Sequence, residues 1–243
     1  MFSPSYKMIP ILAIVPGLLM AAPIKQIESN VPVDHVYAPA GFDSNDNAEV
    51  VVSGFLPNLC YKAPKAKVEV KGDKINIGVR ALKNIGGLSF CADVIVPYVE
   101  VVNIGLLDQG KYKLAVNENS PYERKADMKV NEASSNSIDE AIYANVSEIV
   151  QKEGSRKIIL KGFNPSDCFE FDKIELVDNG IDSYSVLPKL KQIRDFCPKK
   201  MVAFSYEFSV PENLPAERIL LHVRVMDGKS MNALFNNQAP AEE

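Results

Sequence analysis

The decisive stretch of sequence is GFLPNLC at residues 54–60, which returns as GFNPSDC at residues 162–168. The glycine, phenylalanine, proline and cysteine keep their spacing, and each is displaced by 108 positions, from 54 to 162 for the glycine. Self-similarity at a fixed displacement is the signature of a duplicated structural unit. The sequence therefore predicts two diverged copies of one module of roughly 105 residues.

Other segments repeat with nearly the same displacement. The pair Phe90-Cys91 returns as Phe196-Cys197. An alternating apolar set recurs as well: Tyr112, Leu114 and Val116 match Ile219, Leu221 and Val223. Upstream, the segment 33–38 is echoed by the segment 138–144, which aligns His35 with Glu140.

Apolar residues within the copies alternate with a period of two, which is typical of half-buried β-strands. Val68 and Val70 lead into a Gly72-Asp73 turn and a second alternating run at 75–79, which predicts a hairpin. The second copy repeats this design around Asn179-Gly180. Further strands are expected at 50–53, 94–96, 99–104, 112–116, 158–161, 202–210 and 219–226.

This density of short strands predicts an all-β chain of two tandem Ig-like antiparallel β-sandwich domains. The first domain is expected at residues 31–132 and the second at 137–236, joined around 117–136. A disordered tail is expected at 237–243.

Two segments have helical spacing. Apolar positions between 138 and 150 fall on one helical face, with Ser137 and Glu140 spaced as a capping box. The counterpart in the first copy runs into Pro39, which a helix would not accommodate, so the equivalence of the copies favours a strand. Leu187, Leu190 and Ile193 are spaced for a single helical turn linking strands.

The composition is that of an ordinary globular protein. The 243 residues carry 27 Lys and Arg against 31 Asp and Glu, a formal charge of −4, and 47% are hydrophobic. These proportions exclude collagen-like, wholly disordered and polytopic membrane chains. Because there is no net positive charge to neutralise phosphates, nucleic acid is not expected as a partner.

Residues 1–22 are typical of a signal peptide. Lys7 lies in a short polar start, an apolar run extends over 8–20, and Ala21 and Ala22 supply the small-residue end. The run is shorter than the about 20 residues of a membrane span and is interrupted by prolines. We therefore expect cleavage near Ala22 and a periplasmic or extracellular mature chain without a transmembrane segment.

An even number of cysteines in an exported chain indicates disulfides. Four cysteines allow three pairings, and the duplication favours Cys60 with Cys91 and Cys168 with Cys197. Zinc sites need close pairs of ligands, whereas the nearest cysteines lie 29 residues apart, from 168 to 197. Neither a metal nor another cofactor is expected.

Candidate catalytic residues are scarce. Nucleophilic catalysis usually needs a histidine base beside a serine or cysteine, and only His35 and His222 are present. The strand pattern points His222 away from Leu221 and Val223, as for an exposed or interface histidine, and His35 is replaced by an acid in the other copy. No carboxylate pair is singled out by its spacing. The chain is therefore not expected to be an enzyme.

Two kinds of charged cluster remain. The loop 43–49 gathers the oxygen ligands that calcium prefers, but Ala48 stands where an EF-hand requires glycine, and a plain polar turn is the favoured interpretation. Basic residues concentrate at 62–71 and 189–200. Such runs can attract anionic polysaccharide or lipid headgroups, although most are solvated faces.

The stretch 54–60 with its G-x-x-P-x-x-C motif, the segment 107–116 and HVRVMDG at 222–228 resemble those of uncharacterised exported bacterial proteins with tandem Ig-like β-sandwich units. The resemblance implies a fold but no substrate and no catalytic residue. The second copy departs from the first at Asn164 and Ser166. The absence of tryptophan separates the chain from antibody domains.

These features predict a non-enzymatic binding or structural protein of the bacterial envelope, which recognises an unknown protein or envelope component through loops or strand edges. Phe55, Leu56 and Asn58 are the predicted binding residues, with a core position as the competing interpretation of Phe55. The alternative function is an exported inhibitor of a hydrolase, a protease or lysozyme, acting through a disulfide-constrained loop.

Overall fold

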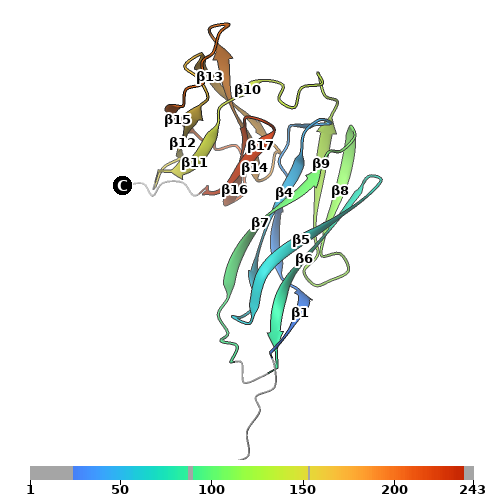
Figure 1. Ribbon diagram of the computed structural model, residues 1–243. Coiled ribbons are helices and arrows are strands. Elements are labelled where there is room, and N and C mark those ends of the chain that lie inside the picture. The colour runs from blue at the N-terminus through green and yellow to red at the C-terminus, as the bar shows by residue number, and fades with distance from the viewer. Residues whose placement is uncertain (1–23, 87–89, 153, 238–243) are drawn as a thin grey trace, which may run out of the picture.

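The computed structural model describes residues 24–86, 90–152 and 154–237. These residues form strands and connections arranged as two β-sandwich domains in series, with domain 2 above domain 1 in Figure 1. The prediction of two tandem sandwiches is therefore confirmed. No described segment is a helix able to cross a membrane. The expected signal peptide lies outside the described residues.

Domain 1 has two facing sheets. One consists of β2 (Val33–Tyr37), β4 (Ala48–Leu56) and β7 (Val96–Gly105). The other consists of β1 (Lys25–Asn30), β3 (Phe42–Asp43), β5 (Tyr61–Lys71), β6 (Lys74–Ile85), β8 (Gly110–Val116) and β9 (Arg124–Asn131). Alternate residues of both sheets, among them Val50, Val52, Ile75 and Ile77, form one buried core.

Domain 2 repeats this plan. Its smaller sheet consists of β11 (Val146–Gln151), β12 (Lys157–Asn164) and β15 (Val202–Ser209). Its larger sheet consists of β10 (Ile142–Tyr143), β13 (Phe169–Asp178), β14 (Ser183–Gln192), β16 (Arg218–Val225) and β17 (Lys229–Asn236). The two larger sheets are mixed, because β3 with β9, β6 with β8 and β14 with β16 are parallel pairs, whereas the two smaller sheets are antiparallel.

The repeated glycine has a steric cause. A Cβ atom on Gly54 would lie 2.1 Å from the carbonyl oxygen of Pro32, and one on Gly162 would lie 2.1 Å from that of Asn145. The next residue of each strand donates its backbone N–H to the same carbonyl, at 3.3 and 3.2 Å. Gly54 therefore lets β4 approach the residue that precedes β2, and Gly162 lets β12 approach the residue that precedes β11. The same close contact is made in both domains.

The strand register corrects part of the sequence alignment. Val33 lies opposite Gly54 and Val146 lies opposite Gly162, so Val146 is the counterpart of Val33. The echo of 33–38 in 138–144 was therefore wrong, and His35 corresponds to Glu148 rather than to Glu140. The false alignment arose because the connection between β2 and β4, residues 38–47, is longer than its equivalent between β11 and β12, residues 152–156. The match of 112–116 with 219–223 is confirmed by the two parallel pairs.

Several predicted boundaries also change. The strand preference at 138–150 is confirmed by β10 and β11. The helical turn at 187–193 was wrong: β14 continues to Gln192, with Leu190 in the core. The joint at 117–136 was too wide, because β9 pairs with β8 and extends domain 1 to Asn131. At the tail, the Asn237 side chain bonds the carbonyl groups of Leu214 and Ala216, and residues 238–243 are not described.

Each domain contains its own disulfide. Cys60 is bonded to Cys91 with 5.3 Å between the Cα atoms, and Cys168 to Cys197 with 5.4 Å. The predicted pairing is confirmed. Each bridge closes a loop of about 30 residues, which on the chain-entropy model stabilises its domain by roughly 3 to 4 kcal/mol.

Candidate functional site

The predicted binding residues of domain 1 lie at the end of β4 that enters the first bridge. Leu56 is 6% exposed and belongs to the core. Asn58 uses its Oδ1 atom to accept the backbone N–H of Cys60 at 3.1 Å, so its side chain holds the turn. Phe55 is half-buried on the outer side of β4, opposite Pro97. Of the three residues, Phe55 alone is free to present its side chain.

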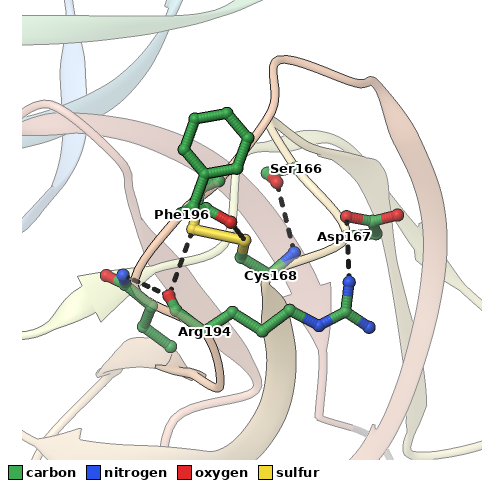
Figure 2. Close-up of a disulfide and its surroundings, with 7 residues drawn as sticks. Ser166, Asp167, Cys168, Arg194 and Phe196 are labelled. Carbon is green, nitrogen blue, oxygen red and sulfur yellow. Dashed lines mark hydrogen bonds and ion pairs between the residues drawn. A yellow bond between two sulfur atoms is a disulfide. The ribbon is translucent and has the colours of Figure 1, made fainter.

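The same turn is built in domain 2 with a different residue. Ser166 stands at the position of Asn58, and its Oγ atom accepts the backbone N–H of Cys168 at 3.2 Å (Figure 2). The sequence departure at this position therefore conserves one hydrogen bond with a shorter side chain. This role in the turn was missed from the sequence, although asparagine and serine are both common turn formers.

The loop between β14 and β15 is fastened to the β12–β13 turn by more than its disulfide. Asp167 binds Lys200 at 3.2 Å and Arg194 at 3.9 Å, and Figure 2 shows the Arg194 side chain extended toward it. The backbone N–H of Ile193 donates to Cys168 at 2.9 Å, and that of Lys200 donates to Pro165 at 3.0 Å. These contacts preorganise a loop that a β-sandwich would otherwise leave free.

Both bridges present an exposed phenylalanine. Phe196 directly precedes Cys197 and is 82% exposed, and Phe90 directly precedes Cys91 and is 90% exposed. Other exposed apolar residues follow the same loops: Val94 and Ile95 in domain 1, and Ile193 and Met201 in domain 2. We call these two exposed apolar surfaces, one beside each disulfide, the bridge ends. The repeated Phe-Cys pair was the signal in the sequence that could have predicted them.

The two bridge ends lie away from the contact between the domains. In domain 1 the bridge lies beyond the C-terminal end of β4. The loop that precedes the N-terminal end of β4 contacts domain 2. In domain 2 the bridge lies at the open end of the β13–β14 hairpin, and the turn of that hairpin contacts domain 1. Each phenylalanine therefore lies at the end of its domain that is remote from this contact.

The domain contact is made by the outer faces of two central strands. Every residue of β4 except Phe55 is buried, and so is every residue of β16 except Arg218. Alternate residues of these strands fill the two cores, and the others meet between the domains. Val51 and Tyr37 of domain 1 pack against Leu220 and Leu234 of domain 2. The uninterrupted apolar runs at 50–52 and 219–221 were the available signal for strands buried on both faces.

Both histidines lie in this contact, each beside a carboxylate of the other domain. His222 is 1% exposed and its Nδ1 atom lies 3.2 Å from Glu49, while His35 Nε2 lies 2.5 Å from Asp182. The expectation of an interface histidine at 222 is therefore correct, and an exposed position is excluded. Glu49 also accepts hydrogen bonds from Ser230 and Asn232, both at 2.7 Å.

The acidic loop 43–49 is more than a plain polar turn. Asp46 binds the Arg224 guanidinium, and Asn45 donates to the carbonyl of Ser135 at 3.1 Å in the segment that joins the domains. The loop thus supplies carboxylates to the domain contact, where Asp46 pairs with the cation that β16 carries, Arg224.

The residues that form the domain contact differ between the two copies. At the positions equivalent to Glu49 and Ser53, domain 2 has Lys157 and Lys161, both exposed. At the position equivalent to Leu220, domain 1 has Lys113. Within the described residues, the faces equivalent to the two contact faces therefore carry exposed lysines in place of the contact residues.

Comparison with known proteins gives a match over part of the chain. Against the curated proteins and the solved structures, nothing matches this chain significantly. Residues 50–125 match the family model described as the ORF11 beta-sandwich domain. This segment begins in β4 and ends in β9, so the chain contains a region similar to that β-sandwich family.

Proposed function

We propose that this chain is a non-enzymatic binding or structural protein of the bacterial envelope, acting outside the cytoplasm. Two intradomain disulfides support an oxidising compartment, and the β-sandwich match supports a fold that presents loops. The observation that carries the proposal is the pair of exposed phenylalanines, Phe90 and Phe196, each next to a bridge cysteine. An aromatic side chain on a fixed loop is a typical anchor for a protein partner.

The second candidate is an inhibitor of an exported hydrolase. It is favoured by the loop of Phe196, which is held by the bridge, by Asp167 and by backbone hydrogen bonds. A loop fixed in this way loses little entropy when it enters a cleft. The two candidates differ in the partner, since an inhibitor forms a stoichiometric complex with a protease or lysozyme.

The test is capture of partners from envelope extract with the wild type and with Phe90→Ser and Phe196→Ser. Leu106→Ser is the matched control, because Leu106 is also an exposed apolar side chain but lies in the β7–β8 connection. We expect a partner that at least one phenylalanine variant loses and the control retains. Equal capture by all variants, or turnover of glycans, esters or peptides by the purified protein, contradicts the proposal.

A further inference from the structure

The outer face of the larger sheet of domain 1 is strongly basic. Core residues alternate with cations along each strand, so the cations point away from the core. The strands β5 and β6 contribute Lys65, Lys67, Lys71, Lys74 and Arg80 to this face. Strands β8 and β9 contribute Lys111, Lys113, Lys125 and Lys129. We call this surface the basic face.

Few carboxylates balance these cations. Glu69 and Asp127 are the acidic side chains that the same four strands place on the face. Within the described part of the chain, Lys65, Lys67, Lys111, Lys113 and Lys129 have no ion-pair partner. Unpaired cations are therefore concentrated on the basic face, although the whole chain has a formal charge of −4. By contrast, Lys189, Lys191 and Lys200 near the second bridge are each paired with a carboxylate.

A trough crosses the basic face over Gly78. One hollow, of about 690 Å³, lies over β6 between β5 and β1, and its lining includes Lys65, Lys67 and Arg80. A second hollow, of about 170 Å³, shares Asn76, Gly78 and Arg80 with the first and reaches Ala115 of β8. A Cβ atom on Gly78 would meet no atom within 4 Å, so the missing side chain keeps the floor open.

The lining mixes three kinds of group. The cations can pair with acidic groups of a ligand, and Glu28, Glu69 and Asn76 can hydrogen-bond to its hydroxyl groups. Leu82 offers an apolar edge. Nucleic acid fits less well, because no described aromatic side chain lines the trough for base stacking. A flat lipid surface would not enter a hollow.

We propose that the basic face binds a linear anionic polysaccharide, with the chain lying in the trough over Gly78 and its acidic groups paired with the surrounding lysines. The inference rests on the non-enzymatic binding role proposed above but uses a different surface from the bridge ends.

The test measures binding of polygalacturonate, a linear uronic acid polymer, to the disulfide-bonded protein by titration calorimetry at two salt concentrations. We expect binding that weakens with salt, and no binding of neutral dextran. Gly78→Val should reduce the affinity at least tenfold with no change in charge, because the side chain obstructs the floor of the trough on a strand that tolerates valine. Lys65→Glu with Lys67→Glu should do the same, whereas the matched reversal of Lys157 and Lys161 should change the affinity less than twofold.

Three results would overturn the proposal: no binding of the polymer, wild-type affinity in Gly78→Val, or tighter binding of phosphatidylglycerol vesicles or single-stranded DNA than of polygalacturonate. The two proposals fail separately. Phe90→Ser and Phe196→Ser should keep full polymer binding, and Gly78→Val should keep the captured protein partner.

Discussion

Arg224 of domain 2 and Asp46 of domain 1 form a bidentate ion pair in the domain contact, where their side chains are 8% and 4% exposed. Arg224 Nη1 donates to Asp46 Oδ2 at 2.8 Å, and Nη2 donates to Oδ1. The same carboxylate accepts the backbone N–H of Asp43 at 2.9 Å. Because the pair is buried and the carboxylate is bonded on both oxygens, it fixes one relative position of the two domains.

Breaking this pair should destabilise the protein strongly. Arg224→Met leaves the Asp46 charge buried without its partner, which typically costs about 3 to 5 kcal/mol. The free energy of unfolding, measured in urea, should fall by that amount, with a separate transition for one domain. Lys157→Met is the control, because Lys157 pairs with Glu207 at the surface and such pairs contribute about 0 to 1 kcal/mol. Equal effects of the two substitutions would show that the contact does not form in solution.

The Glu49 carboxylate should make the domain contact sensitive to acid. Burial acts to raise the pKa of Glu49, but the hydrogen bond and charge of His222 and the hydrogen bonds of Asn232 and Ser230 outweigh it and hold the pKa below its ordinary value. A lowered pKa in the folded state gives stability that is present above the unfolded value of about 4.3 and lost as pH falls through the folded value. The free energy of unfolding should therefore decline below about pH 4.3.

Glu49→Gln tests this origin of the acid sensitivity. The amide keeps an oxygen acceptor for Ser230 and Asn232 but does not titrate, so the decline in stability between about pH 5 and pH 3 should be shallower than in the wild type. Glu207→Gln, at an exposed pair, is the control and should leave most of the wild-type slope. If Glu49→Gln retains that slope as well, the titrating group is another carboxylate.

Asp43 should have the opposite effect on stability. Burial, with the hydrogen bond and charge of Glu140 and the charge of Asp46, raises the pKa of Asp43 to about 6. A carboxyl group whose pKa is raised on folding costs stability as pH rises from its unfolded value through about 6. Asp43→Asn should therefore raise the free energy of unfolding by about 1 kcal/mol at pH 7 and by less at pH 4. A loss of stability at pH 7 would mean that the Asp43 charge is needed.

The duplication, the period-two strands and both disulfides were predictable because each leaves a local pattern in the sequence. In the Gly-x-x-Pro-x-x-Cys motif, the glycine makes the close contact with a backbone carbonyl, and the residues before the cysteine form the turn. Both features occur in each domain. Strand register was harder to predict, since the connections that follow β2 and β11 differ in length and similar short apolar patterns offered a false alignment. The parallel pair of β14 and β16 left no local signal.

The domain contact could not be predicted from the same reasoning. Glu49, Asp46 and Arg224 are polar residues that normally belong to the surface, and only their partners in the other domain make burial acceptable. The trough on the basic face was also hidden, because it depends on β1 and β5 lying on opposite sides of β6. The lysines of 62–71 were visible in the sequence, but those of β8 and β9 join them only through sheet pairing.

Gly54 and Gly162 should be the least replaceable glycines of the two domains. In Gly54→Ala the new Cβ atom would lie 2.1 Å from the Pro32 carbonyl oxygen and 2.7 Å from the Tyr98 hydroxyl, so the backbone of β4 or β2 must move. Overpacking of this kind costs typically 1 to 3 kcal/mol and more where backbone is involved, roughly 3 kcal/mol here. Gly162→Ala should cost about the same, because Asn145 presents the same carbonyl.

Gly78→Ala is the matched control, since it places the same methyl group on a strand glycine with no atom within 4 Å. It should leave the midpoint of urea unfolding unchanged or raise it slightly, because alanine restricts the unfolded chain more than glycine does. Comparison of the three variants thus separates close approach from a general effect of replacing glycine in a strand. Equal midpoints for Gly54→Ala and Gly78→Ala would show that β4 and the carbonyl of Pro32 are not in contact, and the steric explanation of the repeated motif would be wrong.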